Sequence, residues 1–255
     1  MQTPKYWKSI LGIALAFTTV ALCAVRWFAF PSPLLHSELE RFFIGDLAFM
    51  CLQILIVTGI LETYLKRREK EVLREKLNMI IGAFFSDTGF DLLKAIAEVD
   101  RNSEELGGKI TPQVGWVKKD YEQAEATFRA YTPAIELDPS SLAYMKKFLI
   151  EHKASILGLL ANQALLEHEQ FADLLWAANH VSDELQARGD LNNLPQADLA
   201  HLELDTKRAY EILVLEWMEY LEHLSKRYPY LFALASRRSP FDPACRSEVH
   251  AEITR

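Results

Sequence analysis

Histidine and carboxylate side chains recur three or four residues apart in the C-terminal half of the chain. Residues with this spacing share one face of a helix, and bundle metal sites use imidazole and carboxylate groups from facing helices. The duplicated Glu-x-x-His pattern of di-iron bundles is absent. The best candidates for chemistry are therefore three helical pairs: His180 and Asp183, His201 and Asp205, and Glu219 and His223, the last of which also fits a solvated helix face.

No recognised catalytic motif accompanies these pairs. The sequence has no phosphate-binding loop, dinucleotide fingerprint, His-Glu-x-x-His or nucleophile elbow. Cys23, Cys51 and Cys245 have no metal-ligand spacing, and this cysteine usage is typical of a reducing cytoplasm. His152 and His168 fall on apolar stripes, where we expect hydrogen-bonded core histidines. We therefore predict a protein that is not an enzyme, with no catalytic residues, cofactor or metal ligands.

Two long apolar stretches, residues 10–30 and 42–65, precede this region. Each is about as long as the ~20 helical residues that cross a hydrocarbon core, so we predict a transmembrane helical hairpin. Asp46 and Gln53 are the candidate polar residues within it. Asp46 is shallow enough for an interfacial carboxylate but could belong to an ion path. Gln53 could bond across a helix contact or remain a solitary amide.

Basic residues predict the orientation of this hairpin. The connecting turn, 31–41, has one basic residue, whereas 66–76 has six, beginning with Lys66, Arg67 and Arg68. The positive-inside rule then places both termini in the cytoplasm, and these three residues could contact lipid headgroups. The alternative is a cleaved signal peptide, but there is no convincing small-x-small cleavage site around Ala21 to Arg26.

The remainder of the chain reads as an acidic helical bundle. Residues 77–255 contain 18 Lys and Arg against 28 Asp and Glu, which argues against nucleic-acid binding. Apolar residues recur at helical spacing, and no alternating strand pattern competes. We expect an all-α fold with four parts: the hairpin at 1–65, a basic stalk and amphipathic helix at 66–100, a cytoplasmic helical bundle at 101–235 and a flexible tail at 236–255.

Local signals predict where the helices begin and end. Gly107-Gly108 indicates a loop, and Thr111-Pro112 and Asp138-Pro139 each indicate a helix start. The longest helix is expected at 196–226. Trp176 lies off the main apolar stripe of its helix, so it could be exposed as an anchor for a partner or could pack against another helix.

The order of apolar stretches, the basic segment at Lys66 and the helical remainder resembles that of bacterial two-helix membrane proteins with a cytoplasmic helical domain. Some of these proteins are membrane-acting effectors of anti-phage systems. The resemblance implies a multi-pass protein of the bacterial inner membrane. The resemblance concerns the order of segments alone, so it assigns no functional residue to this chain.

Three functions fit these features. The leading hypothesis is a non-enzymatic membrane protein whose bundle binds a cytoplasmic protein partner or senses a signal, while the hairpin contacts lipids and anchors or forms a homo-oligomer. The second is an oligomeric pore, in which Asp46 or Gln53 faces the conduit. The third is a metal-dependent enzyme in the bundle.

Overall fold

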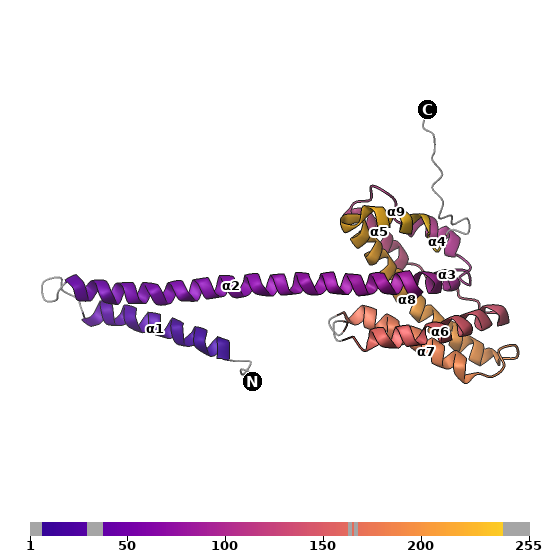
Figure 1. The fold of residues 1–255 in the computed structure, drawn as a ribbon, viewed down its shortest axis with the longest axis horizontal. Helices are drawn as coiled ribbons and strands as arrows, with labels where there is room; N and C mark the ends of the chain where they lie inside the picture. The colour runs from indigo at the N-terminus through magenta and orange to yellow at the C-terminus, as the bar shows by residue number, and fades with distance from the viewer. Residues whose placement is uncertain (1–6, 30–37, 163–164, 166–167, 242–255) are drawn as a thin grey trace, which may run out of the picture. The chain divides into compact units, whose positions relative to one another are not determined.

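The computed structural model describes residues 7–29, 38–162, 165 and 168–241 (Figure 1). All regular structure in this part of the chain is helical, so the predicted all-α fold is confirmed. Extended backbone pairs only at an isolated antiparallel bridge between Asp100 and Ile135 within these residues. The chain divides into two units, Met1–Val72 and Leu73–Arg255.

The first unit contains α1, Trp7–Ala29, and most of α2, Glu38–Phe84. Large apolar side chains on both helices are exposed, including Phe17 at 75% and Ile60 at 66%. The Thr18 hydroxyl donates to the carbonyl oxygen of Ala14 at 2.8 Å, and Thr63 repeats this contact on α2. Such bonds satisfy a hydroxyl inside its own helix, which suits an apolar environment. The expected turn between the two apolar stretches falls largely outside the described residues.

One helical segment of the described chain, Phe49–Ala97, contains a stretch long and apolar enough to cross a membrane. None of that stretch is buried, unlike the core helix of a soluble protein. The apolar part of α1, Gly12–Ala21, is shorter. The structure therefore supports one of the two predicted crossings by length and composition, which is a weak indication of membrane association.

The helix α2 continues through the basic segment, as the absence of Gly and Pro predicts. Lys66 pairs with Glu62 at 3.0 Å, one turn earlier. Further along, Leu77, Ile81 and Phe84 are buried in the core of the second unit. The second unit therefore begins at Leu73, whereas we expected separate segments at 66–100 and 101–235.

A π-helical turn, Phe85–Gly89, links α2 to α3, Phe90–Ala97. Such a turn contains one more residue than an α-helical turn and so rotates the face that follows. Phe84 contacts the Phe171 ring edge-to-face at 5.3 Å, and Phe85 stacks on Tyr220 at 5.1 Å. The turn thus directs two consecutive phenylalanines into the core.

The next two helices, α4 (Ser103–Ile110) and α5 (Lys118–Arg129), differ from the prediction. Gly107 lies inside α4 and contacts Phe241 so closely that a Cβ at Gly107 would be 2.3 Å from the Phe241 Cβ, which explains a glycine here without a loop. The helix expected from Pro112 begins only at Lys118. Gly115 has a φ of +93°, which interrupts the helix, and the Asp120 carboxylate accepts the Val117 N–H at 2.8 Å.

The helix α6, Pro139–Leu160, begins where predicted. The Asp138 carboxylate accepts the Ser141 N–H at 2.8 Å, and Pro139 occupies the first position. Three helices follow: α7, Glu169–Ala187, α8, Gln196–Arg227, and α9, Pro229–Arg237. The bounds of α8 lie within one residue of the predicted helix.

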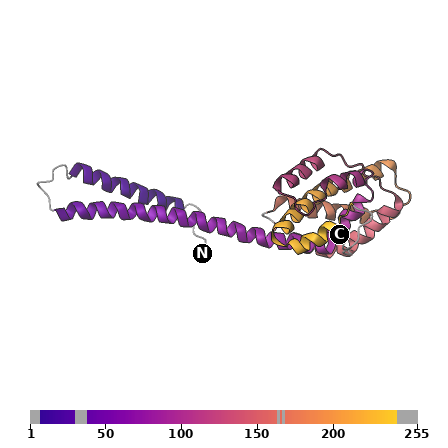
Figure 2. The same cartoon turned by 90° about the horizontal axis from the view of Figure 1, so that it is seen from above.

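The core of the second unit is built around α8, which packs against α3, α5, α7 and α9, while α6 packs against α3 and α7 (Figures 1 and 2). Tyr210, Leu213 and Trp217 on α8 are fully buried. The core extends past the expected boundary at residue 235, because the ring of Phe241 contacts that of Trp217 at 5.5 Å. The rest of the expected tail, from residue 242, lies outside the described residues.

Candidate functional site

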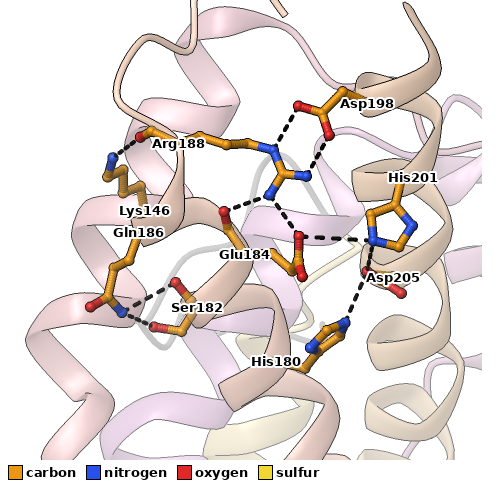
Figure 3. A network of polar contacts seen from close by, with 9 residues as sticks. All are labelled: Lys146, His180, Ser182, Glu184, Gln186, Arg188, Asp198, His201 and Asp205. Carbon is orange, nitrogen blue, oxygen red and sulfur yellow. Dashed lines mark hydrogen bonds and ion pairs between the residues drawn. The ribbon is translucent and has the colours of Figure 1, made fainter. Parts of the chain in front are cut away.

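Two histidine–carboxylate pairs meet between α7 and α8 (Figure 3). His180 and Glu184 lie one turn apart on α7, and His201 and Asp205 lie one turn apart on α8. The two helices pack against each other, so both pairs reach the same place. We call these four residues the α7–α8 cluster.

Asp205 is the buried centre of the cluster, with 3% of the residue exposed. Its Oδ1 accepts a hydrogen bond from Arg208 at 3.2 Å. Its Oδ2 lies 3.2 Å from the His180 Nε2 and 3.3 Å from the His201 Nε2, with no hydrogen bond of acceptable geometry among the described residues. One carboxylate oxygen is thus enclosed by two imidazole nitrogens.

Arg188 holds the other carboxylate of the cluster in place. Its guanidinium donates to the Glu184 carboxylate at 2.7 Å and to both carboxylate oxygens of Asp198, at 2.8 and 2.5 Å. These bonds lower the pKa of Glu184 and of Asp198 and raise that of Arg188, because each favours the charged forms. Lys146 on α6 donates to the Arg188 carbonyl oxygen at 2.6 Å and links a third helix to this network (Figure 3).

The donor atoms of His180, Glu184 and His201 lie within 4.8 Å of one another. A second group with this property contains His168, Glu216 and Glu219. There the His168 Nδ1 accepts the Phe171 N–H at 3.2 Å and so begins α7 as its cap. Burial raises the pKa of Glu216 to about 8, and the charge of Glu219 adds to the effect. Both groups could supply imidazole and carboxylate ligands.

The structure brings together one of the three predicted pairs, His201 and Asp205. His180 contacts Asp205 instead of Asp183, whose carboxylate accepts hydrogen bonds from Lys153 and Asn179. His223 is not paired with Glu219, because its Nδ1 lies 3.0 Å from the Asn78 amide nitrogen. Helical spacing put both members of each pair on one face but could not identify partners on neighbouring helices.

The remaining sequence candidates are not members of this cluster. Asp46, Gln53, Lys66, Arg67 and Arg68 are exposed on α2. Trp176 is 60% exposed on α7, one helical turn before His180. The expected core contacts of His152 are present, because its Nδ1 lies 2.9 Å from the Phe148 carbonyl oxygen and its ring stacks on that of Phe148.

Glu184, Arg188 and Glu216 were not recognised from the sequence. Glu184 follows His180 by four residues, so the same spacing rule contained a usable signal. Arg188 lies where α7 ends, and its bonds to Asp198 depend on how the loop brings α8 back. Nothing in the spacing of Glu216 distinguishes it from the exposed glutamates of α8, because its burial is a property of the assembled core.

Two family models match the chain. Residues 73–237 match the C-terminal helical domain of "Uncharacterized protein MJ1433", and residues 2–65 match the MJ1433 N-terminal helical domain. The protein of that name from Methanocaldococcus jannaschii is 37% identical over 238 residues, which cover 93% of this chain and 94% of the relative. No solved structure matches the chain.

These matches overturn the expected resemblance to bacterial membrane proteins, because the relative that covers nearly the whole chain is archaeal. That resemblance rested on the order of apolar and helical segments. Hydropathy and helical spacing follow from lipid and packing constraints that are common to all lineages, so they carried no information about origin. The family consists of an N-terminal and a C-terminal helical domain.

Proposed function

The chain belongs to the family of the MJ1433 helical domains, and on that premise we propose that it is a non-enzymatic, membrane-anchored protein whose acidic helical unit binds a protein partner. The two family domains follow the division between the apolar N-terminal helices and the second unit. This division supports a membrane-anchoring role for the apolar N-terminal helices and a partner-binding role for the second unit. The proposal rests on the surfaces of this chain.

The observation that carries the proposal is the continuous exposed apolar surface of α2. Soluble proteins rarely expose contiguous apolar patches larger than a few hundred Å². The same surface is compatible with lipid acyl chains, because the helix satisfies its own backbone groups. The exposed large apolar residues between positions 47 and 61 are Leu47, Phe49, Met50, Leu52, Ile54, Ile56, Val57, Ile60 and Leu61.

We place two crossings in the membrane, α1 and the N-terminal part of α2, with both termini in the cytoplasm. The basic residues Lys66, Arg67 and Arg68 would then lie at the cytoplasmic headgroups, where anionic lipids attract them. The small residues Gly12 and Ala16 on α1 offer a face for close helix packing, including with a second copy. Gln53 on α2 can form hydrogen bonds across such a contact.

Trp176 is the proposed anchor for the partner. A tryptophan that is 60% exposed presents a large apolar surface, and tryptophan is enriched among residues that dominate binding energy. The exposed carboxylates of Glu169 and Asp173 precede it on α7, and residues 77–255 have a net charge of −10. We therefore expect a partner with a basic surface around an apolar pocket that accepts the indole ring.

Photocrosslinking from position 176 tests the partner proposal. A benzophenone side chain at 176 in the full-length chain should crosslink one defined protein, whereas the same group at position 144 should not. Tyr144 is a suitable control, because it is also a solvent-exposed aromatic residue. Purified together, the two proteins should lose about 10-fold or more in affinity with Trp176→Ala, as expected for an interface hot spot.

The matched variant Tyr144→Ala should change that affinity by less than about 2-fold, which is typical of a residue outside the hot spot. Trp176 is exposed, so its replacement leaves the core intact, and circular dichroism can verify this. Equal affinities for the wild-type chain and Trp176→Ala would contradict the proposed docking surface.

A further inference from the structure

We infer that the α7–α8 cluster, His180, Glu184, His201 and Asp205, is a binding site for a divalent transition-metal ion of the Zn²⁺ type. The inference goes beyond partner binding and stands on the geometry of two helices alone. It assigns the four residues as ligands, two from each helix, and it assigns no reaction to the ion.

Three of the separations between donor atoms are close to those around a tetrahedral ion. Zinc lies about 2.0–2.2 Å from imidazole nitrogen and carboxylate oxygen, so two ligands of a tetrahedron are about 3.3–3.6 Å apart. The Asp205 Oδ2 lies 3.2 and 3.3 Å from the two Nε2 atoms, and the Glu184 Oε2 lies 3.8 Å from the His201 Nε2. The group of donor atoms that lie within 4.8 Å of one another contains His180, Glu184 and His201 but not Asp205, so a bound ion would draw the Glu184 and Asp205 carboxylates closer together.

The buried oxygen of Asp205 is the independent observation that points to a ligand. A buried carboxylate oxygen without a hydrogen bond is costly, so native structures usually satisfy it with a partner, water or an ion. The Asp205 Oδ2 has no such bond within the described part of the chain and is directed toward both histidines. A cation between the three groups would satisfy this oxygen.

Outer contacts hold the carboxylate ligands in position. Arg188 donates to the Glu184 Oε2, the oxygen that also faces His201, and Arg208 donates to the Asp205 Oδ1, which leaves the Asp205 Oδ2 for the ion. Hydrogen bonds of this kind orient the ligands in metal sites. Each histidine side chain is about half exposed, so an ion can enter from solvent.

The ligand set selects the class of metal. Two imidazoles favour Zn²⁺, Ni²⁺ or Co²⁺, whereas Mg²⁺ and Ca²⁺ prefer sites made of oxygen ligands. The group around His168 is a weaker candidate, because it has one imidazole whose Nδ1 already caps α7. Protonated Glu216 is also a poor ligand, and a raised pKa keeps its proton at neutral pH.

Zinc titration against a chromophoric chelator tests the inference near neutral pH, with the full-length chain freed of any histidine tag. The wild-type protein should bind about one Zn²⁺ per chain, and Co²⁺ should give the intense visible absorption of a tetrahedral site. The variant His180→Ala/His201→Ala should weaken binding by about 100-fold or more and abolish this absorption. Asp205→Asn should weaken binding by about 10-fold or more, because the amide cannot donate the charged oxygen.

The matched control is His152→Ala/His223→Ala, which removes the same number of histidines elsewhere in the second unit. It should retain the affinity and the cobalt spectrum of the wild type. If the double ligand variant loses its helical circular dichroism, it is misfolded and its affinity is not informative. Asp205→Asn, which preserves side-chain shape, then provides the test. The inference is overturned if the wild type binds no Zn²⁺ or if the ligand variants bind as tightly as the control.

Discussion

Replacing Glu216 by Gln is expected to remove most of the pH dependence of the stability of the second unit between about pH 4.5 and 8. Burial raises the pKa of Glu216 from 4.5 to about 8, with a further contribution from the charge of Glu219 and an opposing one from Gln170. Neither carboxylate oxygen has a hydrogen bond of good geometry among the described residues, so the contact with Gln170 offsets the cost of burial only in part. The native protein therefore retains a proton that the unfolded chain releases.

The direction in which stability changes with pH follows from this difference in bound protons. Below pH 4.5 both states are protonated, and the native state has its full stability. As the pH rises toward 8, the unfolded chain ionises first, so the free energy of unfolding falls by about 1.4 kcal/mol per pH unit. Over the whole window the loss is roughly 5 kcal/mol, and above pH 8 it levels off.

Urea unfolding of the wild type and Glu216→Gln across this window measures the effect. The glutamine amide is neutral at every pH, so the free energy of unfolding of the variant should vary much less. The variant Glu219→Gln is the control and should keep most of the wild-type slope, because burial is the larger cause. Parallel profiles for the wild type and Glu216→Gln would show that Glu216 is not the titrating group.

Replacing Phe241 by Ala is expected to lower the free energy of unfolding by about 3–5 kcal/mol, the usual cost of removing a buried phenylalanine ring. Phe241 is buried, and its ring contacts that of Trp217 at 5.5 Å. The exposed aromatic residue Tyr230 provides the control, and Tyr230→Ala should change stability by less than about 0.5 kcal/mol.

A substitution at Gly107 provides a second test of the same contact. A methyl group at Gly107 would overlap the Phe241 side chain, so Gly107→Ala alone should cost about 1–3 kcal/mol. With Phe241→Gly already present, which also removes the Phe241 Cβ that the new methyl group would meet, the same change should be neutral or favourable, since Ala is a better helix former than Gly. Additive effects in this double-mutant cycle, followed by urea unfolding, would contradict the packing of Phe241 on α4.

The sequence predicted those elements whose signals are local. The apolar stripe of α8 and the Asp138-Pro139 cap of α6 gave helix starts that the structure confirms. Gly107 and Gly108 misled the prediction, because a glycine can indicate a loop or a close contact with a distant residue. Phe241, which supplies that contact, is 134 positions away along the chain, and the spacing of nearby residues contained no sign of it.

The α7–α8 cluster was predicted in part for a related reason. The spacing of His201 and Asp205 predicted a shared face, and the structure brings them together. Their other partners, His180 and Glu184, come from the neighbouring helix. Which helix faces which depends on the loop between them and on the core, so the full donor set became visible only in three dimensions.

The central proposal is that the exposed apolar surface of α2 anchors the protein in a membrane. Alkaline carbonate extraction of membranes from cells that produce the full-length chain tests it most directly. The wild type should remain in the membrane pellet, and changing Ile56 and Ile60 to Asp should release it, because charged groups near the middle of a spanning helix oppose insertion. A wild-type chain that is extracted into the soluble fraction as a folded protein would contradict the proposal.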